Sequence, residues 1–165
     1  KIEPLRGNVQ TRLRKLDEGQ YAAIILAAAG LKRLGLGQRI RALISSEDTL
    51  PAVGQCALGI ECRADRTDVI ALLQPLHHPD TAACVLAERA LSRALAGSCQ
   101  VPLGGFAEVK NGKLRMRGFV ASPDGKRMTY SELMGDIAHP EELGSKVADA
   151  LRAQGADEIL AELAL

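Results

Sequence analysis

The sequence predicts a parallel α/β segment followed by a small α+β domain with a three-stranded antiparallel sheet and helices. The first prediction depends on a near-continuous apolar run at Tyr21–Ala27, with helical patterns on either side. The second depends on a period-two alternation from Gly105 onwards and on the hairpin dipeptide Asn111-Gly112. With 165 residues, of which 47% are apolar, the chain can form one large domain or two small ones with packed cores.

The first part of the chain alternates between strand and helix patterns. We expect the end of a strand at Lys1–Leu5, a helix at Val9–Asp17, a strand at Tyr21–Ala27 and a helix at Ala28–Leu34. A continuous apolar run is typical of a strand covered on both faces, so this order predicts a parallel sheet. Because the chain opens on a lysine within a strand pattern, we expect the sheet to begin in a segment that precedes it.

A stretch rich in turn-forming residues joins the two parts. Leu50–Glu61 contains a proline and two glycines, and this punctuation predicts a hinge or a crossover between domains.

A long helix should open the last domain. Asp80 or Thr81 can cap its start, because both side chains accept hydrogen bonds from backbone N–H groups. Cys84 lies beside the buried face of this helix, and we interpret it as structural. That face is formed by residues at helical spacing, which are Ala83, Leu86, Ala87, Ala90, Leu91 and Ala94.

Three strands and a further helix complete the predicted domain, with the helices on one side of the sheet. The outer strands should run at Gly105–Val109 and Met128–Leu133. One face of the central strand carries Leu114, Met116, Gly118 and Val120. The last clear helix opens at Pro140 and is ended by Gly155, while residues 157–163 fit more than one structure. Its inward side carries Leu143, Val147, Ala150 and Leu151.

The net charge of +1 is unevenly distributed. Residues 1–41 hold nine Lys or Arg against three Asp or Glu, which gives +6, and the remainder holds twelve against seventeen, which gives −5. The basic part indicates an anionic partner. Aromatic residues for base stacking are absent among these charges, so we expect no nucleic acid and favour small carboxylates or phosphates.

The cysteine and histidine pattern favours free thiols. The four cysteines contain no C-x-x-C pair, and with the three histidines they form no zinc pattern, so we expect no metal. For the pair His77-His78 we favour a surface or capping role. Neither a signal peptide nor an apolar run of membrane-spanning length is present, and we therefore expect a cytoplasmic protein without membrane contact.

Several basic residues should gather beside the predicted parallel sheet. Ligands of such sheets bind beyond the carboxyl ends of the strands. Arg6 follows the first predicted strand and Arg12 lies one helical turn further on, while Lys32 and Arg33 follow the second. The turn at Gly7-Asn8 leads into a helix N-terminus, which attracts anions. We interpret the other basic side chains of this region as solvated, namely Arg14, Lys15, Arg39 and Arg41.

Cys99 lies in a bend between the long helix and the first strand of the last domain. Gly97 and Ser98 adopt turn conformations readily, and Pro102 restricts the residue before it to extended geometry. These neighbours predict a shaped loop with an accessible sulfur. A buried, inert cysteine at a helix end is the alternative.

The stretch Gly97–Gly104 resembles the cofactor-attachment loop of the hydroxymethylbilane synthase family, also called porphobilinogen deaminase. Arg6–Leu13 and Leu26–Leu34 resemble motifs of that family's second domain. Leu50–Ala57 resembles its Leu-Pro-Ala-Val-Gly-Gln-Gly-Ala segment, with Cys56 in place of the usual glycine. Further matches follow at His78, Thr81 and Glu88-Arg89-Ala90.

The resemblance implies a transferase of tetrapyrrole (haem) biosynthesis, which condenses four porphobilinogens head to tail into hydroxymethylbilane and releases ammonia. Cys99 would carry a dipyrromethane cofactor through a thioether. Arg6, Arg12 and Arg33 would bind the acetate and propionate groups of the cofactor and growing chain, and Gln55 would border the cleft. If the usual glycine at this position has a positive φ, Cys56 introduces backbone strain, and a second reactive thiol there is not favoured.

The resemblance also implies a domain organisation. Residues 1–52 would end a second, periplasmic-binding-like α/β domain, residues 53–76 would return to a first domain absent from this chain, and residues 77–165 would form the α+β domain. The returning segment would contain a strand at Ala57–Cys62 and a helix at Thr67–Leu73. The family's acid/base aspartate belongs to the first domain, so we expect no catalytic acid or base in this chain, and no activity from it alone. The full-length protein is expected to be a monomer.

Two alternatives remain open. The first is a non-catalytic anion-binding module, which explains the arginines but not the loop of Cys99. The second is a cysteine hydrolase, which requires a histidine such as His77 or His78 near that sulfur.

Overall fold

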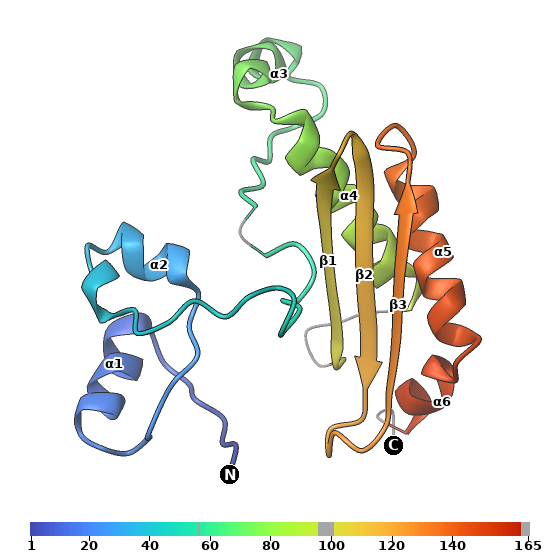
Figure 1. Cartoon of the computed structure of the whole chain (residues 1–165). Helices are drawn as coiled ribbons and strands as arrows, with labels where there is room; N and C mark the ends of the chain where they lie inside the picture. The colour runs from blue at the N-terminus through green and yellow to red at the C-terminus, as the bar shows by residue number, and fades with distance from the viewer. Residues whose placement is uncertain (56, 96–100, 163–165) are drawn as a thin grey trace. The chain divides into compact units, whose positions relative to one another are not determined.

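The computed structural model describes residues 1–55, 57–95 and 101–162, and the chain divides into two compact units, Lys1–Ser45 and Ser46–Leu165. Figure 1 shows the helices and strands of both. In the described ranges, no helix combines the length and apolar character needed to cross a membrane.

The first unit begins with helix α1 (Val9–Asp17), and this confirms the predicted bounds. The side chain of Asn8 caps the helix, because its Oδ1 accepts the N–H of Thr11 at 2.8 Å. Leu13 is the buried residue of α1. Gly19 follows the helix with a φ of 74°, a left-handed conformation that glycine adopts without strain.

Helix α2 (Ala28–Arg33) and a short 3₁₀ helix η1 (Gly37–Arg39) complete the regular structure described in the first unit. The prediction for α2 is confirmed to within one residue. Leu31 is 6% exposed and anchors the helix. An ion pair of 2.5 Å between Arg39 and Asp17 ties η1 to the end of α1.

The strands predicted at Lys1–Leu5 and Tyr21–Ala27 are wrong for this chain, since both segments are irregular. Ile25 is 81% exposed, so the apolar run is not covered on both faces. A strand forms only through hydrogen bonds to a neighbouring strand. The described residues of the first unit contain no such neighbour, and the predicted parallel sheet is therefore not formed by them.

The second unit begins with an extended connection and a short helix. Helix α3 (Thr67–Leu73) is confirmed with its predicted bounds and continues into the 3₁₀ helix η2 (Gln74–Leu76). The strand predicted at Ala57–Cys62 is wrong, again because no strand described in the structure pairs with this segment. Leu58 is 78% exposed in this irregular stretch.

Helix α4 (Pro79–Ala94) is the long helix that the sequence predicted, although its cap differs. The imidazole of His78, rather than Asp80 or Thr81, caps the helix: its Nδ1 accepts the N–H of Thr81 at 3.2 Å. The capping role favoured for the histidine pair is thus confirmed for His78. Leu86 was predicted to be buried but is 41% exposed, whereas Glu88 is buried.

Three antiparallel strands follow in the order β1-β2-β3, as predicted for the α+β domain. Strands β1 (Leu103–Lys110), β2 (Lys113–Ala121) and β3 (Met128–Gly135) are slightly longer than expected. Asn111 and Gly112 both have positive φ, at 53° and 73°, which is the geometry of a two-residue type I′ hairpin.

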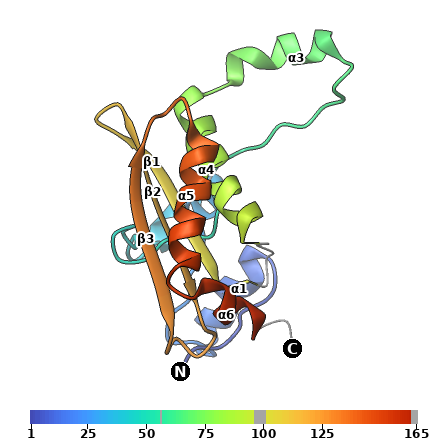
Figure 2. The same ribbon diagram turned by 90° about the vertical axis from the view of Figure 1, so that its right-hand side faces the viewer.

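Helices α4, α5 (Pro140–Arg152) and α6 (Ala156–Ala161) pack on the sheet, and Figure 2 shows α4 and α5 on the same side of it. The predicted apolar face of β2 is confirmed. Its side chains share one core with those of the helices, and the most deeply buried are Leu91, Leu114, Met116, Val120, Val147 and Leu151.

Candidate functional site

Cys99 lies outside the described residues, and so does Cys56, but both ends of the loop that carries Cys99 are described. Leu95, at the end of α4, is 3% exposed and belongs to the core. On the other side of the loop, the N–H of Ala121 donates to the carbonyl of Pro102 at 3.1 Å. The guanidinium of Arg152 donates to the carbonyl of Ala94. The loop therefore joins two fixed points of the α+β domain.

Arg6 and Arg12 are brought to the same end of α1. The Nε of Arg12 donates to the carbonyl of Gly7 at 2.7 Å, and Lys15 Nζ donates to the carbonyl of Arg6 at 3.4 Å. Gly7 has a φ of 124°, and a Cβ there would lie 2.9 Å from the methyl group of Thr11. The turn thus depends on glycine. It places Arg6 and the guanidinium of Arg12 at a helix N-terminus, where the free N–H groups favour anions, and Lys15 reaches back to it from the last turn of α1.

Arg33 is in a different place, in the last turn of α2, and its side chain is exposed. No contact described in the structure joins it to Arg6 or Arg12. Gln55 is exposed and belongs to the second unit. The predicted single crevice for these residues therefore remains a prediction.

The basic residues of the first unit differ in how their charges are compensated. Arg14 pairs with Glu18 at 3.7 Å, and Arg39 pairs with Asp17, as expected for solvated surface charges. By contrast, no ion pair with a carboxylate is found among the described residues for Arg6, Arg12, Arg33 and Arg41. The sequence predicted carboxylate ligands for the first three and a solvated charge for Arg41.

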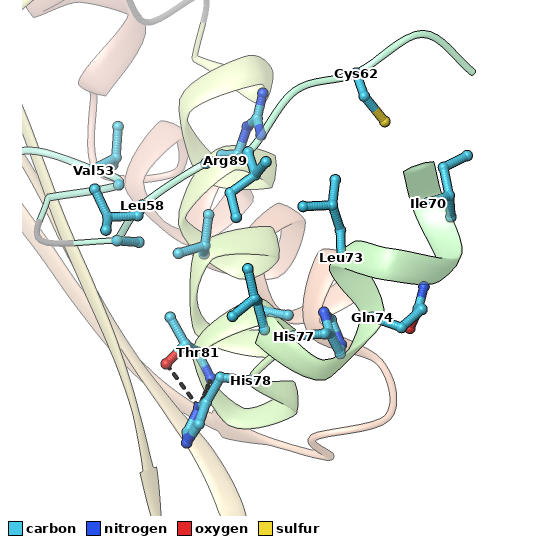
Figure 3. A pocket seen from close by; sticks show the side chains of 17 residues that line it. Val53, Leu58, Cys62, Ile70, Leu73, Gln74, His77, His78, Thr81 and Arg89 are labelled. Atoms are coloured by element: carbon cyan, nitrogen blue, oxygen red, sulfur yellow. Dashed lines mark hydrogen bonds between the residues drawn. The ribbon is translucent and has the colours of Figure 1, made fainter. Parts of the chain in front are cut away.

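A hollow of about 620 Å³ lies in the second unit between described residues of the connection (53–54 and 57–62), the helices α3 and η2, and α4 (Figure 3). Its wall is mostly aliphatic, with Leu58, Ile60 and Leu76 each more than half exposed. His78 lies at its border, where Thr81 engages the ring. This hollow was not predicted from the sequence. The apolar side chains of Ala57–Cys62 that line it were interpreted as those of a strand.

Glu88 is a buried carboxylate that the sequence analysis also missed. Its Oε2 accepts the N–H of Gly54 at 2.6 Å, and its Oε1 accepts the N–H of Ala107 at 2.9 Å. Burial raises the pKa of this carboxyl above its ordinary 4.5, and the two backbone hydrogen bonds oppose the shift. The side chain joins the connection, α4 and β1, so it is a structural link.

The described cysteines and histidines form no metal site. Cys62 is exposed, and Cys84 packs partly against the core, which confirms its structural interpretation. Burial raises the pKa of the Cys84 thiol, so little of it is the reactive thiolate. No group of three or more metal-binding side chains occurs in residues 1–55, 57–95 and 101–162.

Two family models match the chain. Residues 1–71 match the model described as "Porphobilinogen deaminase, dipyromethane cofactor binding domain", and this range contains Arg6, Arg12, Arg33 and Gln55. Residues 82–153 match "Porphobilinogen deaminase, C-terminal domain", and this range contains Cys99.

Curated relatives agree with both matches. Over 163 residues, or 99% of the chain, it is 63% identical to proteins named porphobilinogen deaminase from Nitrosomonas europaea and from Methylobacillus flagellatus. A protein of the same name from Laribacter hongkongensis is 60% identical over 96% of the chain. The matched part is 52–53% of each relative, so the chain spans about half their length.

Proposed function

The chain belongs to the porphobilinogen deaminase family, and we propose that it forms the C-terminal part of an enzyme that condenses four porphobilinogens head to tail into hydroxymethylbilane, with release of ammonia. The observation that carries this proposal is the 63% identity over 99% of the chain to proteins of that name. This identity extends over nearly the whole chain, so it covers the ranges that hold the predicted loop and arginine motifs.

Cys99 is the proposed attachment point of a dipyrromethane cofactor. Loss of ammonia from porphobilinogen leaves an electrophilic methylene carbon, and a thiolate sulfur attacks such a carbon to form a thioether. The bound dipyrromethane supplies the terminal ring on which the product is built. The fixed ends of the loop, at Leu95 and Pro102, support this role because they hold the attachment point on the α+β domain.

Arg6, Arg12 and Arg33 are the proposed ligands of the acetate and propionate groups. Every pyrrole ring of the substrate brings two carboxylates, and a guanidinium binds a carboxylate with two parallel hydrogen bonds. Each charged hydrogen bond contributes about 1.5–3 kcal/mol. Their lack of carboxylate partners in the described structure supports this assignment, since nothing there competes with a bound acid. Gln55 is proposed to border the same cleft.

The domain organisation proposed for the whole protein follows the sequence prediction. Residues 1–52 would end a periplasmic-binding-like second domain, residues 53–76 would return to the first domain, and residues 77–165 would form the α+β domain. The first domain would supply the acid/base aspartate. Exposed apolar side chains support this proposal, because Ile25 in the first unit and Leu58 and Leu76 beside the hollow need a covering partner in water.

We also propose a cytoplasmic, monomeric full-length enzyme that acts on porphobilinogen and binds neither nucleic acid nor membrane. Residues 1–41 contain a single aromatic residue, Tyr21, and so lack a set of rings for base stacking, which supports the first exclusion. The free thiols Cys62 and Cys84 suit a reducing compartment.

The test is porphobilinogen turnover by the full-length protein, with Cys99→Ser as the decisive variant and Cys62→Ser as the matched control at an exposed cysteine. We expect hydroxymethylbilane from the wild type and the control, and none from Cys99→Ser or from these 165 residues alone. Binding of porphobilinogen without turnover by the folded full-length protein would instead favour the non-catalytic anion-binding module.

A further inference from the structure

The face of the sheet opposite the helices carries an ionic cluster around one buried arginine, Arg117, and we call it the Arg115–Arg117 cluster. It consists of these two arginines of β2 together with Glu47, Glu108 and Glu132. Side chains alternate along a strand, so the arginines point away from the core that contains Met116 and the helices α4 and α5. Figure 2 shows those helices confined to the other face.

Arg117 is the centre of the cluster and is 2% exposed. Its Nη1 donates to the carbonyl of Ser46 at 2.9 Å, and its Nη2 donates to the hydroxyl of the same residue at 3.1 Å. Its guanidinium carbon lies 5.4 Å from the centre of the Phe106 ring, within the range of a cation–π contact. Burying a guanidinium is costly unless its charge is paired and hydrogen-bonded, so these partners stabilise Arg117 in its buried position.

Arg115 binds the neighbouring residue, Glu47. Its Nη1 lies 2.9 Å from Glu47 Oε1 and 3.0 Å from Glu108 Oε1, and its Nε lies 2.8 Å from Glu132 Oε1. Hydrogen bonds to these carboxylates raise the pKa of Arg115 and lower the pKa values of Glu47 and Glu132. Three carboxylates surround two guanidinium groups, so the cluster is already neutralised and is not a site for a further anion.

The cluster binds Ser46 and Glu47, which lie where the second unit begins. The first unit ends at Ser45, and Ser46 is the first residue of the second. The cluster therefore fixes the second unit's end of the connection between the two.

We propose that Arg115 and Arg117 are positioning residues, which clamp Ser46 and Glu47 to the sheet and so restrict how the two units move relative to one another during chain extension. The link to chain extension rests on the proposed function. In that function the growing chain is attached to Cys99 in the second unit, while its carboxylates are bound by Arg6, Arg12 and Arg33 in the first. The growing pyrrole chain would then contact both units, and the polypeptide connection between them would limit how it is accommodated.

Hydrogen exchange in the full-length protein tests the clamp without reference to activity. In Arg117→Met we expect amide exchange at residues 42–50 to accelerate by about tenfold or more, since charged hydrogen bonds are lost, with β1–β3 unchanged. Glu47→Gln, at a side chain that is 61% exposed, keeps the sheet intact and should give a smaller increase in the same peptides. Arg93→Gln is the control, because it removes an exposed ion pair with Glu141 between α4 and α5.

Unchanged exchange at residues 42–50 in Glu47→Gln and in folded Arg117→Met would overturn the clamp. If Arg117→Met loses protection from hydrogen exchange throughout β1–β3, this variant no longer folds normally, and the proposal is then tested by Glu47→Gln alone. Faster exchange in the strands and the connection together in Glu47→Gln would mean that the cluster only supports the sheet, and this result would also overturn the proposal.

The second readout is the distribution of enzyme-bound intermediates during porphobilinogen turnover, separated by intact mass. We expect Glu47→Gln to shift this distribution, whereas Arg93→Gln should match the wild type. Faster exchange with a wild-type distribution would overturn the positioning role and leave the proposed function intact. Absence of turnover in the wild type would overturn the proposed function, and the positioning role with it, whatever the exchange result.

Discussion

The carboxylate of Glu88 accepts the backbone N–H of Gly54 at 2.6 Å, which joins helix α4 to a turn 34 residues earlier in the chain. The other carboxylate oxygen accepts the N–H of Ala107 in β1 at 2.9 Å. Both oxygens thus act as acceptors for buried backbone donors, and each donor would be left without a partner if its oxygen were lost.

Glu88→Gln should destabilise the protein by about 2 kcal/mol, because the amide group replaces one acceptor with a donor that faces a backbone N–H. Urea unfolding of the full-length protein measures this difference. Glu141→Gln is the control, since that side chain is exposed and pairs only with Arg93 among the described residues. Equal midpoints for the two variants would contradict the structural role of Glu88.

The same site predicts a pH dependence of stability. Because burial raises the pKa of Glu88 in the folded protein, its contribution to stability is fully present below the ordinary value of 4.5 and is lost as pH rises through the raised pKa. The free energy of unfolding of the wild type, minus that of Glu88→Gln, should therefore fall as pH rises from 4.5. A difference that is flat or increases with pH would show that the carboxyl is not desolvated.

Gly144 should be intolerant of alanine although it lies inside a helix. A Cβ at this position would be 2.1 Å from the carbonyl oxygen of Ala87, so α4 and α5 would have to separate. We expect Gly144→Ala to cost about 1–3 kcal/mol of stability, against the usual helical preference for alanine. Ser145→Ala, one residue along on the exposed side of α5, should be nearly neutral in the same unfolding measurement.

Arg12 and Arg14 offer a matched pair for the proposed carboxylate site, since they lie two residues apart on α1. Arg12 has no carboxylate partner among the residues that the structure describes, whereas Arg14 pairs with Glu18. Arg12→Gln should lower kcat/KM for porphobilinogen by about tenfold to a hundredfold, as expected for lost charged hydrogen bonds. Arg14→Gln should change it little. Equal changes of kcat/KM in the two variants would contradict the assignment of Arg12 to the carboxylate site.

The sequence predicted the elements of the fold correctly where they depend on residues close to one another in the chain. The Asn111-Gly112 hairpin, the helix α1 and the apolar face of β2 depend on residues close in sequence, and all were predicted. Tyr21–Ala27 was predicted wrongly, because an apolar run becomes a strand only when a neighbouring strand is present to pair with it.

Long-range polar links were beyond the sequence analysis for a related reason. Glu88 and Arg117 look like ordinary exposed charges in a helix and a strand. Their burial depends on Gly54 and Ser46, which are respectively 34 and 71 residues away. For the candidate site, the sequence prediction depends on the resemblance of short motifs to a family. Those motifs contain Arg6, Arg12, Arg33 and Cys99.

The most direct test of the central claim is mass analysis of the tryptic peptide Ala94–Lys110 from active, full-length enzyme. Cleavage after Arg93 and Lys110 isolates Cys99 as the only cysteine of this peptide. We expect it to carry the added mass of one dipyrromethane, and we expect the peptides that contain Cys62 and Cys84 to be unmodified. An unmodified Ala94–Lys110 peptide from enzyme that forms hydroxymethylbilane would contradict the account.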